Sequence, residues 1–280
     1  GWGGEGMIRI VTDSSANISQ QEAAALGIEV IPLTVIFGTE AYLEGPEITA
    51  DAFYERLTGG EFPHTSQPSS AQLSEAFARC GGEETIAIFI SSKLSGTVEG
   101  ARSVVREEGL SNVHVVDSLA TTIMLRMMVM EAWRHREKSA AEVLELLAAF
   151  RRRLRLFAAI DTLESLHKGG RLGKNAMIIG NILGIKPIVT ISAEGTVDVV
   201  GKALGQRKAL KVVNDFFRAE RPDPAYPVLY LYSKVDDAGR KLIEQTGGDP
   251  ETTEFYNLCC AVGAHIGTNA AGLAFVSSEE

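Results

Sequence analysis

The chain has 280 residues, a formal net charge of −9 and a hydrophobic fraction of 45%. This length allows one large domain or two of ordinary size, and the apolar content is ample for packed cores, so we expect a soluble globular protein. The acidic balance argues against nucleic acid as the main partner, because neutralising phosphates requires clustered Lys and Arg. We interpret the one dense basic run, Arg151, Arg152, Arg153 and Arg155, as a solvated helix face. A docking patch for an acidic partner is the less favoured alternative.

The cysteines and the apolar runs indicate the compartment. Cys80, Cys259 and Cys260 are an odd number with two adjacent, which is no disulfide framework and implies a reducing, cytoplasmic location. The most apolar region, residues 176–191, is interrupted by polar residues and a proline, so it does not qualify as a membrane span. We recognise no secretory signal, and we expect residues 1–6 to be an added remnant outside the fold.

The N-terminal segment pairs a strand with an oxygen-rich turn. A strand is expected at residues 8–11, followed by the turn 12–15 (TDSS) and a helix over residues 19–26. Capping is the simplest role for Asp13, while metal or phosphate ligation and proton acceptance stay open. Residues 28–37 predict a second strand or a strand pair.

A second oxygen-rich helix start follows a helix that begins at Thr49. Two prolines bracket residues 65–67, which should therefore be extended, and the next helix is expected over residues 71–79.

The third such turn has the strongest pattern. Residues 86–90 are an unbroken apolar run, typical of a strand buried on both faces of a parallel sheet. Residues 91–97 then contain five small polar or flexible residues before a helix. A simple helix cap by Ser95 or Thr97 would explain one hydroxyl, but the density of hydroxyls favours an anion site on the free N–H groups of the helix start. Ligands of open α/β sheets bind at this end of the strands.

The middle of the chain predicts one more strand and two helices. Residues 113–116 form the strand, which ends at Asp117. Residues 119–135 are apolar nearly all round and contain four methionines, which indicates a buried helix; a pocket lined by methionine is the less favoured explanation. Residues 140–157 predict a long amphipathic helix with its arginines late, as the helix dipole prefers.

The pattern becomes mixed after residue 157. The expected elements are strands at 158–161, 228–232 and 272–276, a short helix at 162–168, and a hairpin of 188–191 with 196–200. We therefore place a domain boundary here and expect an N-terminal domain over 7–157 and a C-terminal domain over 158–280. Residues 259–272 are expected to be a loop that holds His265 among small residues. A solitary histidine of this kind is more often structural than catalytic.

Six short motifs carry a resemblance to a known family. They are TDSS at 12–15, TSQPS at 65–69, ISSKLSGT at 90–97, VDS at 116–118, DTLESLHKGGRLG at 161–173 and GAHIG at 263–267. In this order and spacing they resemble the DegV family of bacterial proteins, from Met7 to the end of the chain. The better-understood members of that family are fatty-acid-binding subunits of fatty acid kinase.

The resemblance implies a fold and a role. The fold is α/β, with a Rossmann-like N-terminal domain whose sheet is mostly parallel, a C-terminal α/β domain with a mixed sheet, and a long-chain fatty acid buried between them. The role is that of a lipid-binding protein rather than an enzyme, which presents the fatty acid to a separate kinase subunit for acyl phosphate formation in phospholipid metabolism. The resemblance implies no metal and no cofactor besides the bound fatty acid, and a transient contact with a membrane surface is compatible with this role.

The resemblance also assigns residues. The carboxylate would be held by Thr65, Ser95, the Gly96 amide and His265. Arg171, Ser66 and Ser92 would lie near the head group or the transferred phosphate. The sequence departs from the family at Thr268 and Asn269, where relatives carry Pro-Gly. Because Asn tolerates the left-handed conformation, this loop is expected to keep its shape.

Physical chemistry agrees with a hydrocarbon tail that supplies the affinity and a carboxylate head that is held by hydrogen bonds. A tail of roughly 15 methylenes at about 0.8 kcal/mol each gives about 12 kcal/mol before ordering costs, so the tail must dominate affinity. Hydroxyls and amides satisfy a buried carboxylate without a bidentate arginine pair, which leaves one oxygen free to attack the terminal phosphate of ATP. Arg171 and His265 would stabilise the charge that develops there.

Two alternatives stay open. One is a stand-alone hydrolase or phosphoryl transferase with Ser95 or Ser92 as nucleophile and His265 as base, although no GxSxG or GxxxxGK[ST] motif occurs. The five histidines show no metal-ligand spacing. The other alternative is a regulatory binder of a different anionic amphiphile.

Overall fold

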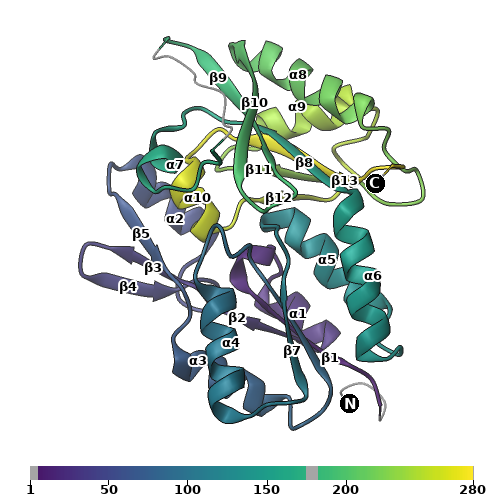
Figure 1. Cartoon of the computed structure of the whole chain (residues 1–280). Coiled ribbons are helices and arrows are strands. Elements are labelled where there is room, and N and C mark those ends of the chain that lie inside the picture. Colours follow the sequence, from purple (N-terminus) through teal and green to yellow (C-terminus); the bar gives the residue numbers. More distant parts are fainter. Residues whose placement is uncertain (1–5, 175–181, 280) are drawn as a thin grey trace.

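The computed structural model describes residues 6–174 and 182–279, which form two stacked lobes (Figure 1). The strands are β1 (Arg9–Asp13), β2 (Ile28–Ile31), β3 (Thr34–Phe37), β4 (Glu40–Leu43), β5 (Pro63–Ser66), β6 (Thr85–Phe89), β7 (Val113–Asp117), β8 (Leu154–Ala159), β9 (Ile185–Ile191), β10 (Val197–Leu204), β11 (Leu229–Tyr232), β12 (Phe255–Asn257) and β13 (Ala271–Val276). The helices are α1 (Gln20–Leu26), α2 (Ala50–Thr58), α3 (Ser70–Arg79), α4 (Thr97–Glu108), α5 (Thr122–Arg134), α6 (Ala140–Arg153), α7 (Glu164–Lys168), α8 (Gln206–Ala219), α9 (Asp237–Gln245) and α10 (Cys260–Ile266), with a short 3-10 helix η1 (Ser14–Ala16).

The first lobe contains a parallel four-stranded sheet in the order β2-β1-β6-β7. Every residue of β6 is buried, as the apolar run predicts. Ile86 and Ile88 belong to one apolar cluster with α5, whereas Ala87 and Phe89 belong to another with α3 and α4. Successive side chains of a strand point to opposite faces, so a strand covered by helices on both sides has no face exposed to water.

A small antiparallel sheet, β4-β3-β5, extends from the first lobe beside α2 (Figure 1). Residues 28–37, predicted to form one strand or a strand pair, form two strands, β2 and β3, which belong to different sheets and do not pair with each other. Thr65 pairs with Val35 in this sheet, so the segment 65–67 is extended at its start, as the flanking prolines predict.

The second lobe is built on a mixed sheet in the order β10-β9-β8-β13-β11-β12, in which only the β11–β12 pair among the described strands is parallel. One face packs against α8 and α9 (Figure 1). Residues on the other face, among them Leu156, Ala158 and Leu231, join an apolar cluster that continues into the first lobe. The two lobes therefore share a core.

The helix predicted over residues 140–157 is too long. α6 ends at Arg153, and residues 154–157 belong to β8, which pairs with both β13 and β9. Residues 154–157 form a strand because β8 pairs on both sides and because Leu154 and Leu156 are buried. The helical pattern of the sequence does not contain this information. The domain division at residues 157 and 158 stays a prediction, and it falls inside β8.

The interpretation of the basic run as a solvated helix face is wrong. Arg151 donates hydrogen bonds to main-chain carbonyl groups of both lobes, those of Leu119 and Ser192 among them. Arg153 and Arg155, from the end of α6 and from β8, form ion pairs with Asp223 (2.6 Å) and Glu220 (3.1 Å). The run spans a helix end and a strand, so its members do not share one helix face.

The apolar region at residues 176–191 is described only from residue 182, and β9 makes up most of that part. Its first residues, like residues 1–5 of the expected N-terminal remnant, lie outside the described residues. Among the helices that the structure describes, none has both the length and the apolar character needed to cross a bilayer.

Candidate functional site

A cavity of about 360 Å³ lies between the two lobes. Much of its wall is apolar and comes from the inner face of the second sheet, from the turn after β6, and from α7 and α10. These wall residues include Ile90, Leu156, Ala158, Ile160, Leu166, Val189, Ile191, Val197, Leu231, Ile266 and Ala270. A pocket of this size and character is typical of a small-molecule site.

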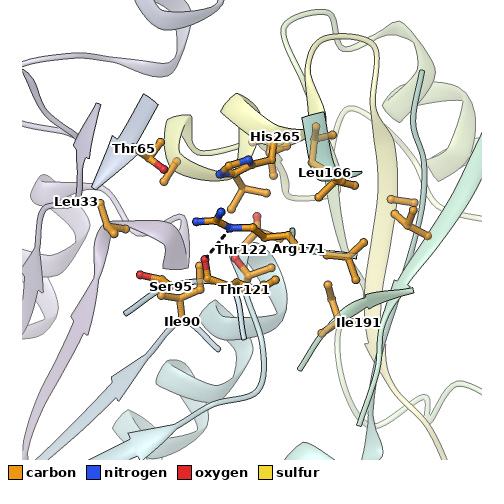
Figure 2. Close-up of a pocket in the computed structure, with 18 of the residues that line it drawn as sticks. Leu33, Thr65, Ile90, Ser95, Thr121, Thr122, Leu166, Arg171, Ile191 and His265 are labelled. Carbon is orange, nitrogen blue, oxygen red and sulfur yellow. Dashed lines mark hydrogen bonds between the residues drawn. The ribbon is translucent and has the colours of Figure 1, made fainter. Parts of the chain in front are cut away.

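Polar side chains gather at one end of the cavity. Thr65 comes from β5 and Ser95 from the turn after β6, both in the first lobe, whereas Arg171 and His265 come from the second. In Figure 2 the guanidinium of Arg171 points to the end where Thr65, Ser95 and His265 lie, and Ile191 lies at the opposite end. The structure therefore brings these four predicted residues together on one cavity wall.

Two of the oxygen-rich turns touch at Gly96. A Cβ atom on Gly96 would lie 1.9 Å from Oε1 of Gln67, so a larger residue at this position would displace the Gln67 side chain from the start of α4. Gly96 is the N-cap residue of α4, so the simple-cap explanation, which gave that role to Ser95 or Thr97, is wrong. The Ser95 hydroxyl instead lies 2.8 Å from the Thr97 hydroxyl and accepts a longer hydrogen bond, 3.3 Å, from the Thr97 amide.

Arg171 is held by main-chain oxygen atoms. Its Nη1 donates to the Gly169 carbonyl (2.5 Å), and its Nε lies 3.4 Å from the carbonyl oxygen of Leu94 in the other lobe. Within the described part of the chain no carboxylate forms an ion pair with Arg171, so its charge is available to a ligand. Burial, and then the positive charge of Arg171, lower the pKa of His265, which favours a neutral imidazole at pH 7.

The oxygen-rich turn at residues 12–15 does not reach the cavity. Oδ1 of Asp13 accepts hydrogen bonds from the Ser15 amide and hydroxyl, and Oδ2 accepts one from the Ile90 amide at 2.8 Å. Asp13 is the N-cap residue of η1, so the predicted capping role is confirmed. Burial raises the pKa of Asp13. The carboxylate thus fixes the end of β1 against the end of β6.

The remaining predicted residues lie at different depths. Ser66 is exposed and lines the cavity mouth. Ser92 is not among the cavity-lining residues, and its amide donates to Asp117 (3.1 Å).

Asn269 has φ +64°, so the expectation that Asn takes the left-handed conformation there is confirmed. Its side-chain amide donates to Asp161 at 2.9 Å.

The segment 259–272, predicted to be a loop, contains helix α10, and His265 lies in its last turn. The residue that fixes this helix is Glu44, which sequence reasoning missed. Glu44 is 6% exposed, and its Oε2 accepts hydrogen bonds from the amides of Cys260 and Ala261 (3.2 Å to Ala261). A carboxylate at the first N–H groups of a helix satisfies them and complements the helix dipole. No local sequence pattern marks Glu44, because its partners in α10 are more than 200 residues away.

Thr121 and Thr122 at the start of α5 also line the cavity and were also missed. Thr122 has φ +47°, a strained conformation for a β-branched residue. Its hydroxyl donates to Oδ1 of Asn17 (2.7 Å), and Asn17 donates in turn to the Asn257 carbonyl of the second lobe (2.8 Å). Contacts between the lobes therefore support this strained wall. The described residues include no group of three or more His, Cys, Asp or Glu side chains placed to hold a metal ion.

Comparison with known proteins gives a consistent result. The model of the family described as "Uncharacterised protein, DegV family" matches residues 7–278. The chain is similar to a DegV domain-containing protein of Caldanaerobacter subterraneus, at 31% identity over 96% of this chain and 98% of the relative. It is also similar to one of Clostridium acetobutylicum, at 34% identity over 96% of this chain and 98% of the relative.

Solved structures extend the comparison to the fold. A DegV family protein from Thermus thermophilus, described by its fatty acid binding, superposes with a TM-score of 0.86 at 31% identity, and the match covers 97% of this chain and 99% of that one. DegV from Bacillus subtilis, described as a fatty acid binding protein, has a TM-score of 0.82 at 26% identity, with 97% and 99% covered.

Proposed function

Since this chain belongs to the DegV family, we propose that it binds a long-chain fatty acid in the cavity between its lobes. The observation that carries the proposal is the polarity of that cavity, whose wall is largely apolar while hydroxyls, an arginine and a histidine gather at one end. This distribution matches a molecule with one charged end and a long hydrocarbon tail. The relatives from Thermus thermophilus and Bacillus subtilis, described as binding fatty acids, support it.

The tail supplies the affinity. Side chains such as Ile160, Val189 and Leu231 are buried or nearly so and offer no hydrogen-bonding groups to a ligand. Each methylene transferred from water to such a wall contributes about 0.8 kcal/mol, so a long chain gains several times more than a single polar contact.

The head group sets the orientation. The hydroxyls of Thr65 and Ser95 and the Gly96 amide would donate to the carboxylate from the first lobe. From the second lobe, neutral His265 would donate one ring N–H. Arg171 would supply a positive charge, since no carboxylate in the described part of the chain forms an ion pair with it. The carboxylate would therefore be bound by several single hydrogen bonds without a bidentate arginine pair.

We also propose that the carboxylate is presented to a separate kinase subunit. Ser66, Gln67 and Gly96 at the polar end are exposed to solvent, so a partner can reach the head group while the tail stays buried. In that reaction a carboxylate oxygen bonds to the terminal phosphorus of ATP, the bond from that phosphorus to the bridging oxygen breaks, and ADP leaves with the electron pair. Arg171 would stabilise the negative charge on the transferring phosphoryl group, with Ser66 nearby at the cavity mouth.

The test is to replace Thr65 and Ser95 by alanine, singly and together, in protein stripped of lipid. A hydrogen bond to a charged group contributes about 1.5–3 kcal/mol, so each single substitution should weaken oleate binding by about tenfold or more. Ser70→Ala, an exposed serine at the start of α3 with no hydrogen bond described for its hydroxyl, is the matched control and should bind as the parent does. Unchanged oleate binding by the double variant would refute the assignment of the head-group site.

The Ser95→Ala variant also tests the alternative that the chain is a hydrolase. The Ser95 hydroxyl lies against the Thr97 hydroxyl, and within the described residues it makes no hydrogen bond with His265. Hydrolysis of ATP or of an ester by the purified chain, abolished by Ser95→Ala, would replace the lipid-carrier proposal.

A further inference from the structure

A second cavity, of about 620 Å³, lies where helices α5 and α6 meet the second lobe (Figure 1). Its lining residues come from β7 and the turn after it, from α5 and α6, from β8, and from the end of β9 and the turn that follows. Ile191 also lines the first cavity, so its side chain belongs to the wall between the two.

Arg151 is the central polar group of this second cavity. Its Nε and Nη2 donate to the carbonyl oxygens of Ser118, Leu119 and Ser192 at 2.8–3.2 Å, and these bonds use three of the five guanidinium N–H groups. A purely structural role, that of joining the two lobes, explains these three N–H groups and leaves the two on Nη1. Within the described part of the chain, Nη1 donates to no acceptor, and no carboxylate forms an ion pair with Arg151.

Arg151 has one acid near it on the cavity wall. That acid is Asp117, whose Oδ1 accepts hydrogen bonds from the amides of Ser92 and Leu119. Arg155 has its own partner, Glu220. Burial, and then the positive charge of Arg155, lower the pKa of Arg151 to about 10, and Asp117 only partly opposes this shift. A partly buried cation bound mainly by neutral carbonyls is stabilised by an anion.

The floor of the cavity is apolar. Met128, Leu147, Leu154 and Ile191 line it and are each at most 8% exposed. Inorganic phosphate could pair with the arginine but would make no apolar contact with this floor. A neutral hydrocarbon could cover the floor but would not pair with the arginine.

We infer that this cavity is a second ligand site, for an aliphatic monocarboxylate whose head binds the Nη1 N–H groups of Arg151 and whose chain lies on the apolar floor. The inference does not depend on the occupant of the first cavity. The two sites share Ile191, and the loop oxygens that hold Arg151 belong to residues just before Thr121 and just after Ile191. Ligands in the two cavities should therefore influence each other's affinity, and such an influence is reciprocal.

The experiment measures how much decanoate the full, lipid-free chain binds, by equilibrium dialysis. The expected result is two sites. Ala148→Trp fills the mouth of the second cavity from the exposed surface of α6 and should remove one site. Ala141→Trp, at an exposed position of the same helix outside the cavity, is the matched control and should retain both. The Thr65 and Ser95 variants should weaken the first site much more than the second, so failure of this inference and failure of the proposed function are distinguishable.

A second variant and a second probe test the head group. Arg151→Met should weaken the second site by about tenfold to a hundredfold, which is the value of a hydrogen bond to a charged group. Decylamine, which has the same chain and a positive head, should not bind there. One decanoate site in the parent protein, two sites in Ala148→Trp, or equal binding of decylamine would each overturn the inference. Binding of an acidic peptide in place of decanoate would overturn it as well.

Discussion

Replacing Glu44 tests how the first lobe holds the helix that carries His265. Oε1 of Glu44 accepts the Ser14 hydroxyl at 2.7 Å, and Oε2 accepts the amides of Cys260 and Ala261. These amides are the first N–H groups of α10, which carries His265 in its last turn. Loss of the carboxylate should loosen α10 and displace the imidazole from the polar end of the cavity.

The magnitude follows from the groups left without partners. In Glu44→Ala two buried amides lose their acceptor, at about 1–3 kcal/mol each, and relief of the desolvation of the carboxylate offsets part of this. We expect the free energy of unfolding to fall by about 2–4 kcal/mol at pH 7, measured by urea denaturation. Glu44→Gln retains the shape and one acceptor oxygen, so it should cost about 1 kcal/mol. The matched control, Glu55→Ala on the exposed face of α2, should change stability by less than about 0.5 kcal/mol.

The pH dependence gives an independent check. Burial raises the pKa of Glu44 above its usual value of 4.5, although hydrogen bonds from Ser14 and Cys260 oppose the shift. The folded state then binds the proton more tightly than the unfolded state, so this contribution to stability is full below pH 4.5 and is lost as the pH rises through the folded-state pKa. Glu44→Gln lacks this titration, so the stability gap between the parent and the Gln variant should shrink as the pH rises across that window.

Two results would refute this reasoning about Glu44. One is Glu44→Ala unfolding at the same urea concentration as the parent. The other is parallel stability curves for the parent and Glu44→Gln from pH 4.5 upward.

Two glycine substitutions test the contacts between the lobes. A Cβ on Gly263 of α10 would lie 2.3 Å from the hydroxyl oxygen of buried Tyr54, so Gly263→Ala should lower the free energy of unfolding by about 1–3 kcal/mol in thermal unfolding; an unchanged melting temperature would contradict this packing. A Cβ on Gly195 would lie 2.1 Å from Oγ of Ser91 across the lobe boundary, at φ +87°. Gly247 has nearly the same φ, +88°, and open space around it, so it is the matched control. Gly195→Ala should lower the free energy of unfolding by at least about 1 kcal/mol more than Gly247→Ala does in urea denaturation. Equal losses of stability in the two variants would mean that backbone strain alone causes the effect.

Patterns within short segments determined most of the elements. The apolar run of β6 predicted a strand buried on both faces, and Asp13 was expected to cap a helix, as it does. These features depend on neighbours within a few residues, so a single sequence contains the necessary information. The order and spacing of six motifs also identified the family, which the family model confirms over residues 7–278. The roles of the predicted head-group residues stay a prediction.

The tertiary structure decided what depends on partners far away in the chain. The end of α6 moved to Arg153 because β8 pairs on both sides, and the expected loop at 259–272 became helix α10 because Glu44, 216 residues before Cys260, caps it. Within the basic run, Arg151 joins the two lobes rather than facing solvent, because its acceptors come from segments far away in the chain. Residue type and spacing predict which groups are suited to a site. Only the packing of the lobes determines which of them share a cavity, since burial and hydrogen-bond partners are properties of the folded chain.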